Sequence, residues 1–406
     1  MLVGVLAPAP PRRPPAPLAP QARGAGRPWA QPAPAGPSAP SAWSQAVIPA
    51  SAVGLALATL RSQRARLVGR GANFALSHPS SARPARGAIA CGALRGKVAV
   101  VTGASRGVGR GCAVALGEKG MLVYITGRSK SDLEATAQAV RRAGGEAVVM
   151  LCDHTSDEQT KAVFDKVRNE QGKLHVLVCC AYQQAGVETD RMIDAGKKFH
   201  ELPLDLYDKM NLGPRACYSC SYFAADLLRE TARQSPASDP TPLVAFIGGF
   251  GSVSPAARPW LSSAYAASKA AIDRLARDIH AEFGAGFGGK GPSVVCLWPG
   301  LVYTERVQEM LQDDSDKAKL MTGDLENALC ESPVITGRVA AALAADQELR
   351  QSPFVQGPGI HDRVAVVAEV ARELDILDGG EPGSVVAELY GELRPAAPSL
   401  RSFAYL

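Results

Sequence analysis

The chain has 406 residues, which is enough for one large domain with extensions, and its formal net charge is +5. Residues 1–93 contain ten Arg, no Lys and no acidic residue, and the first acidic residue is Glu118. The remainder has 34 basic and 39 acidic residues and is therefore mildly acidic. This balance argues against a nucleic-acid-binding surface.

The first segment, residues 1–93, is rich in Ala, Pro and Ser and cannot bury enough apolar surface to fold alone. Its Arg-rich, acid-free composition predicts an organelle transit segment, with the chloroplast as first expectation and the mitochondrion as alternative. An unstructured extension without a targeting role is the other interpretation. Residues 94–390 are expected to form one folded domain and residues 391–406 a C-terminal tail. The apolar run from Ala46 to Leu60 is too short and is interrupted by Pro49, so we expect no transmembrane segment.

From Gly96 onward, apolar runs alternate with amphipathic stretches. The runs are rich in Val, Leu and Ile without polar alternation, as in a parallel sheet covered on both faces. The alternation predicts a doubly wound α/β domain with right-handed crossovers. The expected strands are 98–102, 121–126, 147–152, 174–180, 243–247, 293–298 and 364–370, and the expected helices are 131–143, 157–171, 206–233 and 264–283.

Nine Cys are scattered through these elements, which is typical of a reducing compartment. Cys217 and Cys220 have the spacing of a metal or redox pair, but no second pair accompanies them. We therefore interpret them as small buried helix residues, and Cys179 with Cys180 as the core of a strand.

Three glycines follow the first strand. Without side chains, Gly103, Gly107 and Gly109 allow a tight turn and a close approach to a pyrophosphate, and the next helix offers its N-terminal N–H groups to that charge. The intervening residues belong to the same predicted cofactor contact: Ser105, Arg106 and Val108.

The second strand ends at Gly127-Arg128, where an NAD-binding site usually has an acid. Arg128, together with Arg106, predicts instead a clamp for the 2′-phosphate of NADP, because guanidinium matches phosphate geometry. Two solvated arginines are the alternative. Asp153, after the third strand, is expected to accept a hydrogen bond from adenine, or else to cap a helix.

Tyr265 and Lys269 are four residues apart and share one face of a helix. A phenol is a poor acid–base catalyst near neutral pH, and a neighbouring ammonium favours its ionised form. Lys269 can also hold the nicotinamide ribose. Asn211, at the predicted start of a helix, is a candidate anchor for a proton-relay water, or otherwise a helix cap.

After the sixth strand, Pro299-Gly300 turns the chain across the sheet edge, and Val302 and Thr304 are candidates to orient the carboxamide of nicotinamide.

Residues 96–390 resemble the short-chain dehydrogenase/reductase family. The resemblance rests on Thr-Gly-x-x-x-Gly-x-Gly from Thr102, Gly127-Arg128, Asp153, Asn211, Tyr-x-x-x-Lys from Tyr265, and Pro-Gly-x-Val-x-Thr from Pro299. It implies a single Rossmann domain with a mainly parallel seven-stranded sheet. It also implies hydride transfer between NADP(H) and a carbonyl or alcohol, with a Tyr265–Lys269–Asn211 relay. Ala181 would lie beside the cofactor, and helices near Asn211 and Ser262 would pair in a dimer or tetramer.

Two departures from the family pattern stand out. The fourth strand usually ends Asn-Asn-Ala-Gly, whereas this chain has Cys179-Cys180-Ala181-Tyr182. The carbonyl-polarising Ser falls on Gly249 when counted from the strand and on Ser252 when counted back from Tyr265. We predict that Ser252 supplies the hydroxyl. The alternative is a nucleotide-binding protein with a degenerate site, acting as a redox sensor or assembly partner. Substrate specificity is expected to lie in 183–204, 250–263 and 303–334.

Overall fold

The computed structural model describes residues 93–182, 198–249, 252, 262–284, 290–312, 330–356 and 362–396. Their main feature is a seven-stranded, fully parallel sheet with the order β3-β2-β1-β4-β5-β6-β9. The predicted doubly wound α/β fold is confirmed. The strands are β1 (Val98–Thr102), β2 (Leu122–Gly127), β3 (Glu146–Leu151), β4 (Val176–Cys179), β5 (Leu243–Ile247), β6 (Ser293–Trp298) and β9 (Val364–Val366).

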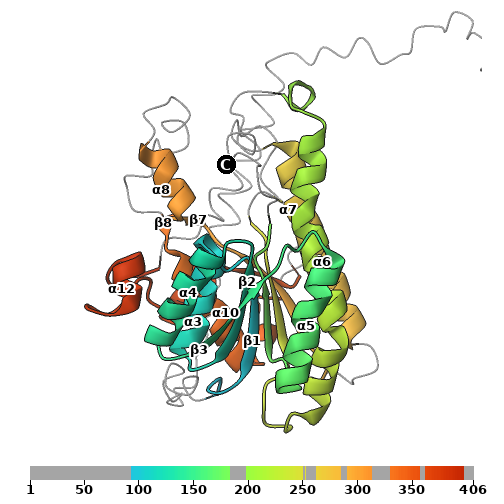
Figure 1. Cartoon of the computed structure of the whole chain (residues 1–406), viewed down its shortest axis with the longest axis vertical. Coiled ribbons are helices and arrows are strands. Elements are labelled where there is room, and N and C mark those ends of the chain that lie inside the picture. Colours follow the sequence, from blue (N-terminus) through green and yellow to red (C-terminus); the bar gives the residue numbers. More distant parts are fainter. Residues whose placement is uncertain are drawn as a thin grey trace, which may run out of the picture. The chain divides into compact units, whose positions relative to one another are not determined.

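Helices cover both faces of the sheet (Figure 1). On one face, α3 (Gly107–Glu118), α4 (Lys130–Arg142) and α10 (Pro333–Ala345) pack through buried residues such as Leu116, Val140 and Ile335. On the other face, α5 (Asp157–Gln171), α6 (Asp205–Gln234) and α7 (Ser263–Gly284) pack through Phe164, Leu227 and Ile272. The strand order reverses between β1 and β4, and a crevice for a ligand is expected at this switch point.

Local sequence signals set several helix ends. The side chain of Ser129 caps α4 by accepting from the N–H of Asp132, and Ser156 caps α5 by accepting from that of Gln159. Helix α5 ends at Gly172, whose φ of 63° suits a residue without a side chain. Among the described residues, no helix is both long and apolar enough to cross a membrane.

The seventh strand is shorter than predicted. The apolar run 364–370 divides into β9 and the helix α11 (Val367–Glu373), and both halves are buried, so hydrophobicity alone does not separate them. Smaller elements near the carboxyl edge are β7 (Leu301–Val302), β8 (Cys330–Glu331) and α8 (Glu305–Gln312), with α12 (Val385–Tyr390) later in the chain. Arg394, in the segment assigned to a tail, forms an ion pair with Asp378 at 3.1 Å.

Three of the four cysteines named from the sequence are buried, whereas Cys180 is half-buried and follows the end of β4. Cys179 is 3% exposed in β4, and Cys217 and Cys220 are 2% and 0% exposed in α6. The Cys179-Cys180 end of β4 is tied to β1, because Thr102 Oγ1 accepts the N–H groups of Cys180 and Ala181 at 3.0 and 3.1 Å. A threonine hydroxyl therefore holds this edge, where the family pattern has two asparagines.

Candidate active site

The glycine turn after β1 is closely packed. Gly103 and Gly107 have φ of 63° and 56°, conformations that residues with a Cβ rarely adopt. A Cβ on Gly103 would lie 2.9 Å from the Ala181 backbone, and one on Gly109 would lie 2.2 Å from the Gly103 carbonyl oxygen. The turn thus brings β1, β4 and the start of α3 together, with Ser105 and Val108 half-buried on it.

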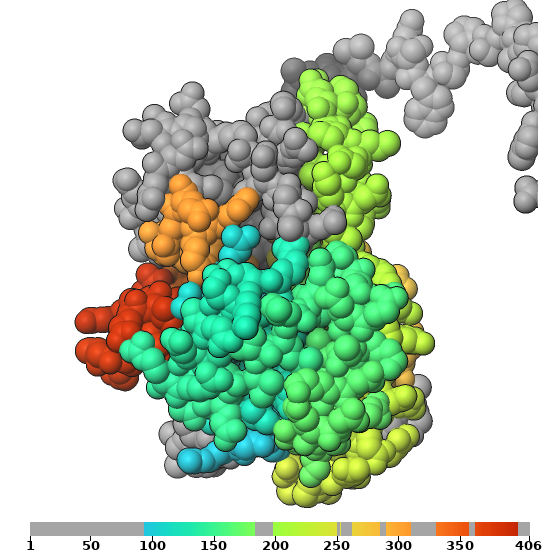
Figure 2. Space-filling model, viewed as in Figure 1, coloured from blue at the N-terminus to red at the C-terminus, as the bar shows by residue number. Residues whose placement is uncertain are grey.

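A carboxylate lies at the N-terminus of α3. Glu305 Oε2 accepts the N–H of Gly107 at 2.9 Å, and Glu305 Oε1 lies 3.8 Å from a guanidinium nitrogen of Arg110. In Figure 2 the surface of α8, which begins with Glu305, adjoins that of the first turn of α3. This helix end therefore already donates a hydrogen bond to an anionic oxygen, as expected of a phosphate site. Glu305 was not predicted from the sequence, because its contact with Gly107 joins segments far apart in the chain.

The proposed 2′-phosphate residues lie at the ends of β1 and β2. Arg106 and Arg128 are both exposed, and Arg128 follows the buried Gly127. Asp153 accepts the N–H and the hydroxyl of Thr155 at 3.0 and 2.9 Å. Partial burial opposes ionisation of Asp153, but these bonds and the positive charge of Arg128 outweigh it and lower its pKa. The cap of α5 is Ser156, so the helix-cap alternative for Asp153 is wrong.

Tyr265 and Lys269 lie one turn apart in α7, as predicted from their spacing. Lys269 is 6% exposed, and its Nζ donates to the Ile247 carbonyl at 3.2 Å. The same Nζ lies 5.5 Å from the ring centroid of Tyr265, which is half-buried. The end of β5 therefore holds the ammonium close to the phenol ring.

Asn211 is in the second turn of α6, which begins at Asp205, one residue before the predicted start at 206, so Asn211 does not open the helix. Its Nδ2 donates to the Tyr207 carbonyl at 2.8 Å, one turn earlier. The helix-cap alternative is excluded by this position. Three residues later, Pro214 has no N–H to bond the Met210 carbonyl, so the regular helical pattern is interrupted beside Asn211.

Ser252 and Gly249 lie on the chain that leaves β5. Ser252 Oγ is buried without a well-aligned hydrogen bond in the described part of the chain, and it lies beside the Asp273 carboxyl. Burial raises the pKa of Asp273, whereas Ser252, Trp298 and Cys296 favour its charged form. A Cβ built on Gly249 would lie 4.0 Å from Lys269 Cε, so position 249 has room for a side chain facing the ammonium.

The turn after β6 reaches back to the glycine turn. Gly300, after Pro299, donates its N–H to Glu331 Oε2 at 2.9 Å, and β7 pairs Val302 with Glu331. Burial raises the pKa of Glu331 to about 7, although the Gly300 N–H stabilises its charged form. A Cβ on Gly107 would lie 3.4 Å from Thr304 Cγ2. Thr304 Oγ1 accepts the N–H of Val307 at 3.3 Å and so caps α8. Glu331 is a second residue that the sequence analysis missed.

The fold and the site define a Rossmann-type α/β protein with an anion-accepting glycine turn and a Tyr–Lys pair at one sheet edge. A family model described as short chain dehydrogenase matches residues 97–238. Dehydrogenase/reductase SDR family member 1 of Mus musculus is 38% identical over 262 residues, covering 63% of this chain and 77% of the relative. The Homo sapiens protein of that name is 35% identical over 260 residues, with the same coverage. The chain therefore belongs to the short-chain dehydrogenase/reductase family of oxidoreductases.

Solved structures share the fold at low identity. The Pseudomonas aeruginosa RhlG/NADP active-site complex has a TM-score of 0.51 at 21% identity, covering 68% of this chain and 95% of that one. Levodione reductase has a TM-score of 0.53 at 18% identity, covering 68% and 99%.

Proposed function

We propose that this protein is an NADP-dependent oxidoreductase acting on a carbonyl or alcohol of a small molecule. The observation that carries the proposal is the buried ammonium of Lys269 beside the Tyr265 ring, at the sheet edge that also holds the glycine turn. The cofactor, when bound, supplies or accepts the hydride. Oxidation of NADPH in the presence of aldehydes, ketones and quinones tests the proposal, and binding without turnover on any of them contradicts it.

The chain's own residues account for the remaining steps. The glycine turn and the α3 N-terminus hold the pyrophosphate, and Arg106 and Arg128 bind the 2′-phosphate, with Asp153 at the adenine. Ala181, Val302 and Thr304 orient the nicotinamide beside the turn made by Pro299 and Gly300. Tyr265 Oη gives its proton to the carbonyl oxygen in reduction and takes it back in oxidation. Lys269 stabilises the ionised phenol by charge, and Asn211 holds the water that returns the proton.

The degenerate-site alternative is favoured by one observation. No hydroxyl stands at Gly249, and the contact of Ser252 is with Asp273, two turns beyond Tyr265 in α7. A protein of this kind binds NADP(H) and lacks turnover. The Tyr265–Lys269 pair supports the enzyme over this alternative.

Ser252 is still our choice for the carbonyl-polarising hydroxyl. We expect Ser252→Ala to lower kcat by about 10²–10³, since it removes a donor to the developing oxyanion. Ser238→Ala, at an exposed serine in the loop before β5, is the matched control. An unchanged kcat in Ser252→Ala, together with a higher kcat in Gly249→Ser, contradicts the prediction. Position 249 is then the place where the hydroxyl donor is missing.

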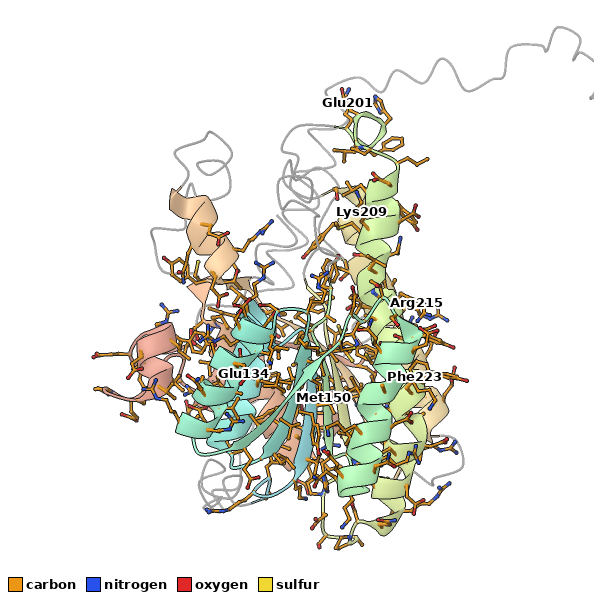
Figure 3. All side chains as sticks on the ribbon, in the orientation of Figure 1. Glu134, Met150, Glu201, Lys209, Arg215 and Phe223 are labelled. Atoms are coloured by element: carbon orange, nitrogen blue, oxygen red, sulfur yellow. The ribbon has the colours of Figure 1, made fainter. Side chains whose placement is uncertain are left out.

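We propose a dimer or tetramer built on α6 and α7. The apolar residues Leu227, Leu228 and Ile272 of these helices do not form this surface, because they are buried in the domain core, and Leu275 packs against that core. Exposed aromatic residues lie elsewhere on α6, with Tyr207 at 53%, Tyr218 at 51% and Tyr222 at 68% exposure. Figure 3 shows Lys209, Arg215 and Phe223 along the same helix. Light scattering at micromolar concentration is expected to give at least a dimer, and Tyr218→Asp with Tyr222→Asp to give a monomer.

Residues 1–92 lie outside the described residues. We propose that they direct import into the chloroplast, with the mitochondrion as alternative, and are removed near Ala90. N-terminal sequencing of the protein from its native cell is expected to begin close to Cys91. An intact Met1 contradicts this.

The predicted specificity segments also lie largely outside the described residues, so the substrate is left as a carbonyl or alcohol.

A further inference from the structure

Tyr182 is an aromatic residue at the carboxyl edge of β4, where the family pattern has glycine. Its ring centroid lies 4.2 Å from Lys269 Nζ, which is closer than the 5.5 Å between that atom and the Tyr265 ring. A cation within about 6 Å of a ring centroid is attracted to the ring. The Tyr182 and Tyr265 rings meet edge to face, with centroids 6.0 Å apart and planes at 69°.

The hydroxyl of Tyr182 is anchored to the catalytic turn of α7. Tyr182 Oη lies 2.5 Å from Ser268 Oγ, and Ser268 Oγ donates to the Tyr265 carbonyl at 2.8 Å. The Tyr182 hydroxyl is then the donor to Ser268. Burial raises the pKa of Tyr182 above its usual value, with a further increase from Tyr265, so this phenol keeps its proton. Tyr182 is thus a fixed structural donor, whereas Tyr265 is the tyrosine proposed to exchange a proton.

Helix α6 leaves space for the Tyr182 ring at Gly213. A Cβ on Gly213 of α6 would lie 2.3 Å from Tyr182 Cδ2 and 2.5 Å from Cε2. Met210, one turn earlier in α6, contacts the hydroxyl end of the same side chain, with its Sδ 4.0 Å from Tyr182 Oη. The glycine in the middle of α6 therefore has a packing reason, since glycine otherwise weakens a helix.

We propose that Tyr182 is a positioning residue for the reaction: its ring face holds the Lys269 ammonium where that charge acts on the Tyr265 phenol. The Ile247 carbonyl binds Lys269 Nζ from the end of β5, and Tyr182 adds a contact from the end of β4. Without the ring, the Ile247 carbonyl and the Asp273 carboxyl still attract the ammonium among the described residues, but the contact from the β4 side is lost. The ammonium then gains freedom to move away from the phenol. This inference rests on the proposed oxidoreductase function.

The test compares Tyr182→Leu, which removes the ring, with Tyr182→Phe, which keeps the ring and removes the hydroxyl. The readout is the pH at which the rate with NADPH and an active carbonyl reaches half its maximum. In Tyr182→Leu we expect this midpoint to move to higher pH by about half a unit to one unit, because the ionised phenol loses nearby positive charge. In Tyr182→Phe the midpoint is expected to stay at the wild-type value, whatever the change in rate.

A second variant covers the case in which Tyr182→Leu does not fold. Gly213→Ala places a methyl group against the ring and is expected to shift the midpoint in the same direction. A wild-type midpoint in both Tyr182→Leu and Gly213→Ala overturns the proposal. An equal shift in Tyr182→Phe and Tyr182→Leu also overturns it, because the hydroxyl bond to Ser268 would then be responsible.

A readout without turnover separates this inference from the proposed function. Tyrosine labelled with ¹³C at Cζ reports the ionisation of Tyr265 in the protein without cofactor, with the signal assigned by its loss in Tyr265→Phe. The same upward shift in Tyr182→Leu and Gly213→Ala supports the inference even if no carbonyl is reduced. Turnover in the wild type without any shift in these titrations refutes the inference alone.

Discussion

Replacing Tyr265 with phenylalanine is expected to lower kcat by roughly 10²- to 10⁴-fold, the usual contribution of a positioned proton donor. The substitution keeps the ring that lies 6.0 Å from Tyr182 and removes only the hydroxyl. The dissociation constant for NADPH is expected to change little, because Lys269 and the glycine turn are unaltered. Steady-state kinetics and a fluorescence titration with NADPH measure the two quantities.

Tyr124→Phe is the matched control. The hydroxyl of Tyr124 donates to Glu170 Oε2 outside the site, so this variant tests the effect of losing a tyrosine hydroxyl elsewhere in the domain. Equal losses in the two variants contradict the role given to Tyr265. A large loss in NADPH affinity in Tyr265→Phe indicates a binding role in place of proton transfer.

The second large effect is expected at Arg128. Arg128→Ala removes a guanidinium from the proposed 2′-phosphate site and is expected to weaken NADPH binding by roughly 10- to 100-fold, as for a lost hydrogen bond to a charged group. Binding of NADH, which has no 2′-phosphate, is expected to change little. The two dissociation constants, measured at one ionic strength, give the selectivity directly.

Arg168→Ala is the control for this experiment. Arg168 is an exposed arginine in the last turn of α5, at the end of the sheet opposite the site, so it tests the effect of net charge alone. Equal wild-type affinity for NADPH and NADH contradicts the NADP assignment. If Arg128→Ala lowers the affinity for NADPH and NADH equally, Arg128 contacts a part of the cofactor that both dinucleotides share.

The sheet was predictable because each core strand is a short apolar run bounded by turn residues. The run at 364–370 was not, because β9 and α11 are both buried and carry the same kinds of side chain. By contrast, α6 was predicted to within one residue at each end, because Leu206 and Met210 already begin its apolar period.

The site was predictable where local spacing sets geometry. The glycine turn and the Tyr265–Lys269 turn are each made by residues at most six positions apart. Glu305 and Tyr182 were missed because their roles depend on contacts between distant segments, Glu305 with Gly107 and Tyr182 with Lys269. Motif spacing carries no information on such contacts.

Glu305 also bears on which ligands the glycine turn selects. Its carboxylate already accepts the Gly107 N–H, so an anion that binds this N–H must displace the carboxylate. A chloride or acetate ion carries no more charge than the carboxylate. Because the carboxylate is covalently attached to the protein and the ion is not, replacing the carboxylate with the ion gives no gain in binding free energy. The pyrophosphate of a dinucleotide carries two charges and arrives with many further contacts. We therefore expect Glu305 to compete for the Gly107 N–H and to be displaced more readily by a dinucleotide than by a simple salt ion.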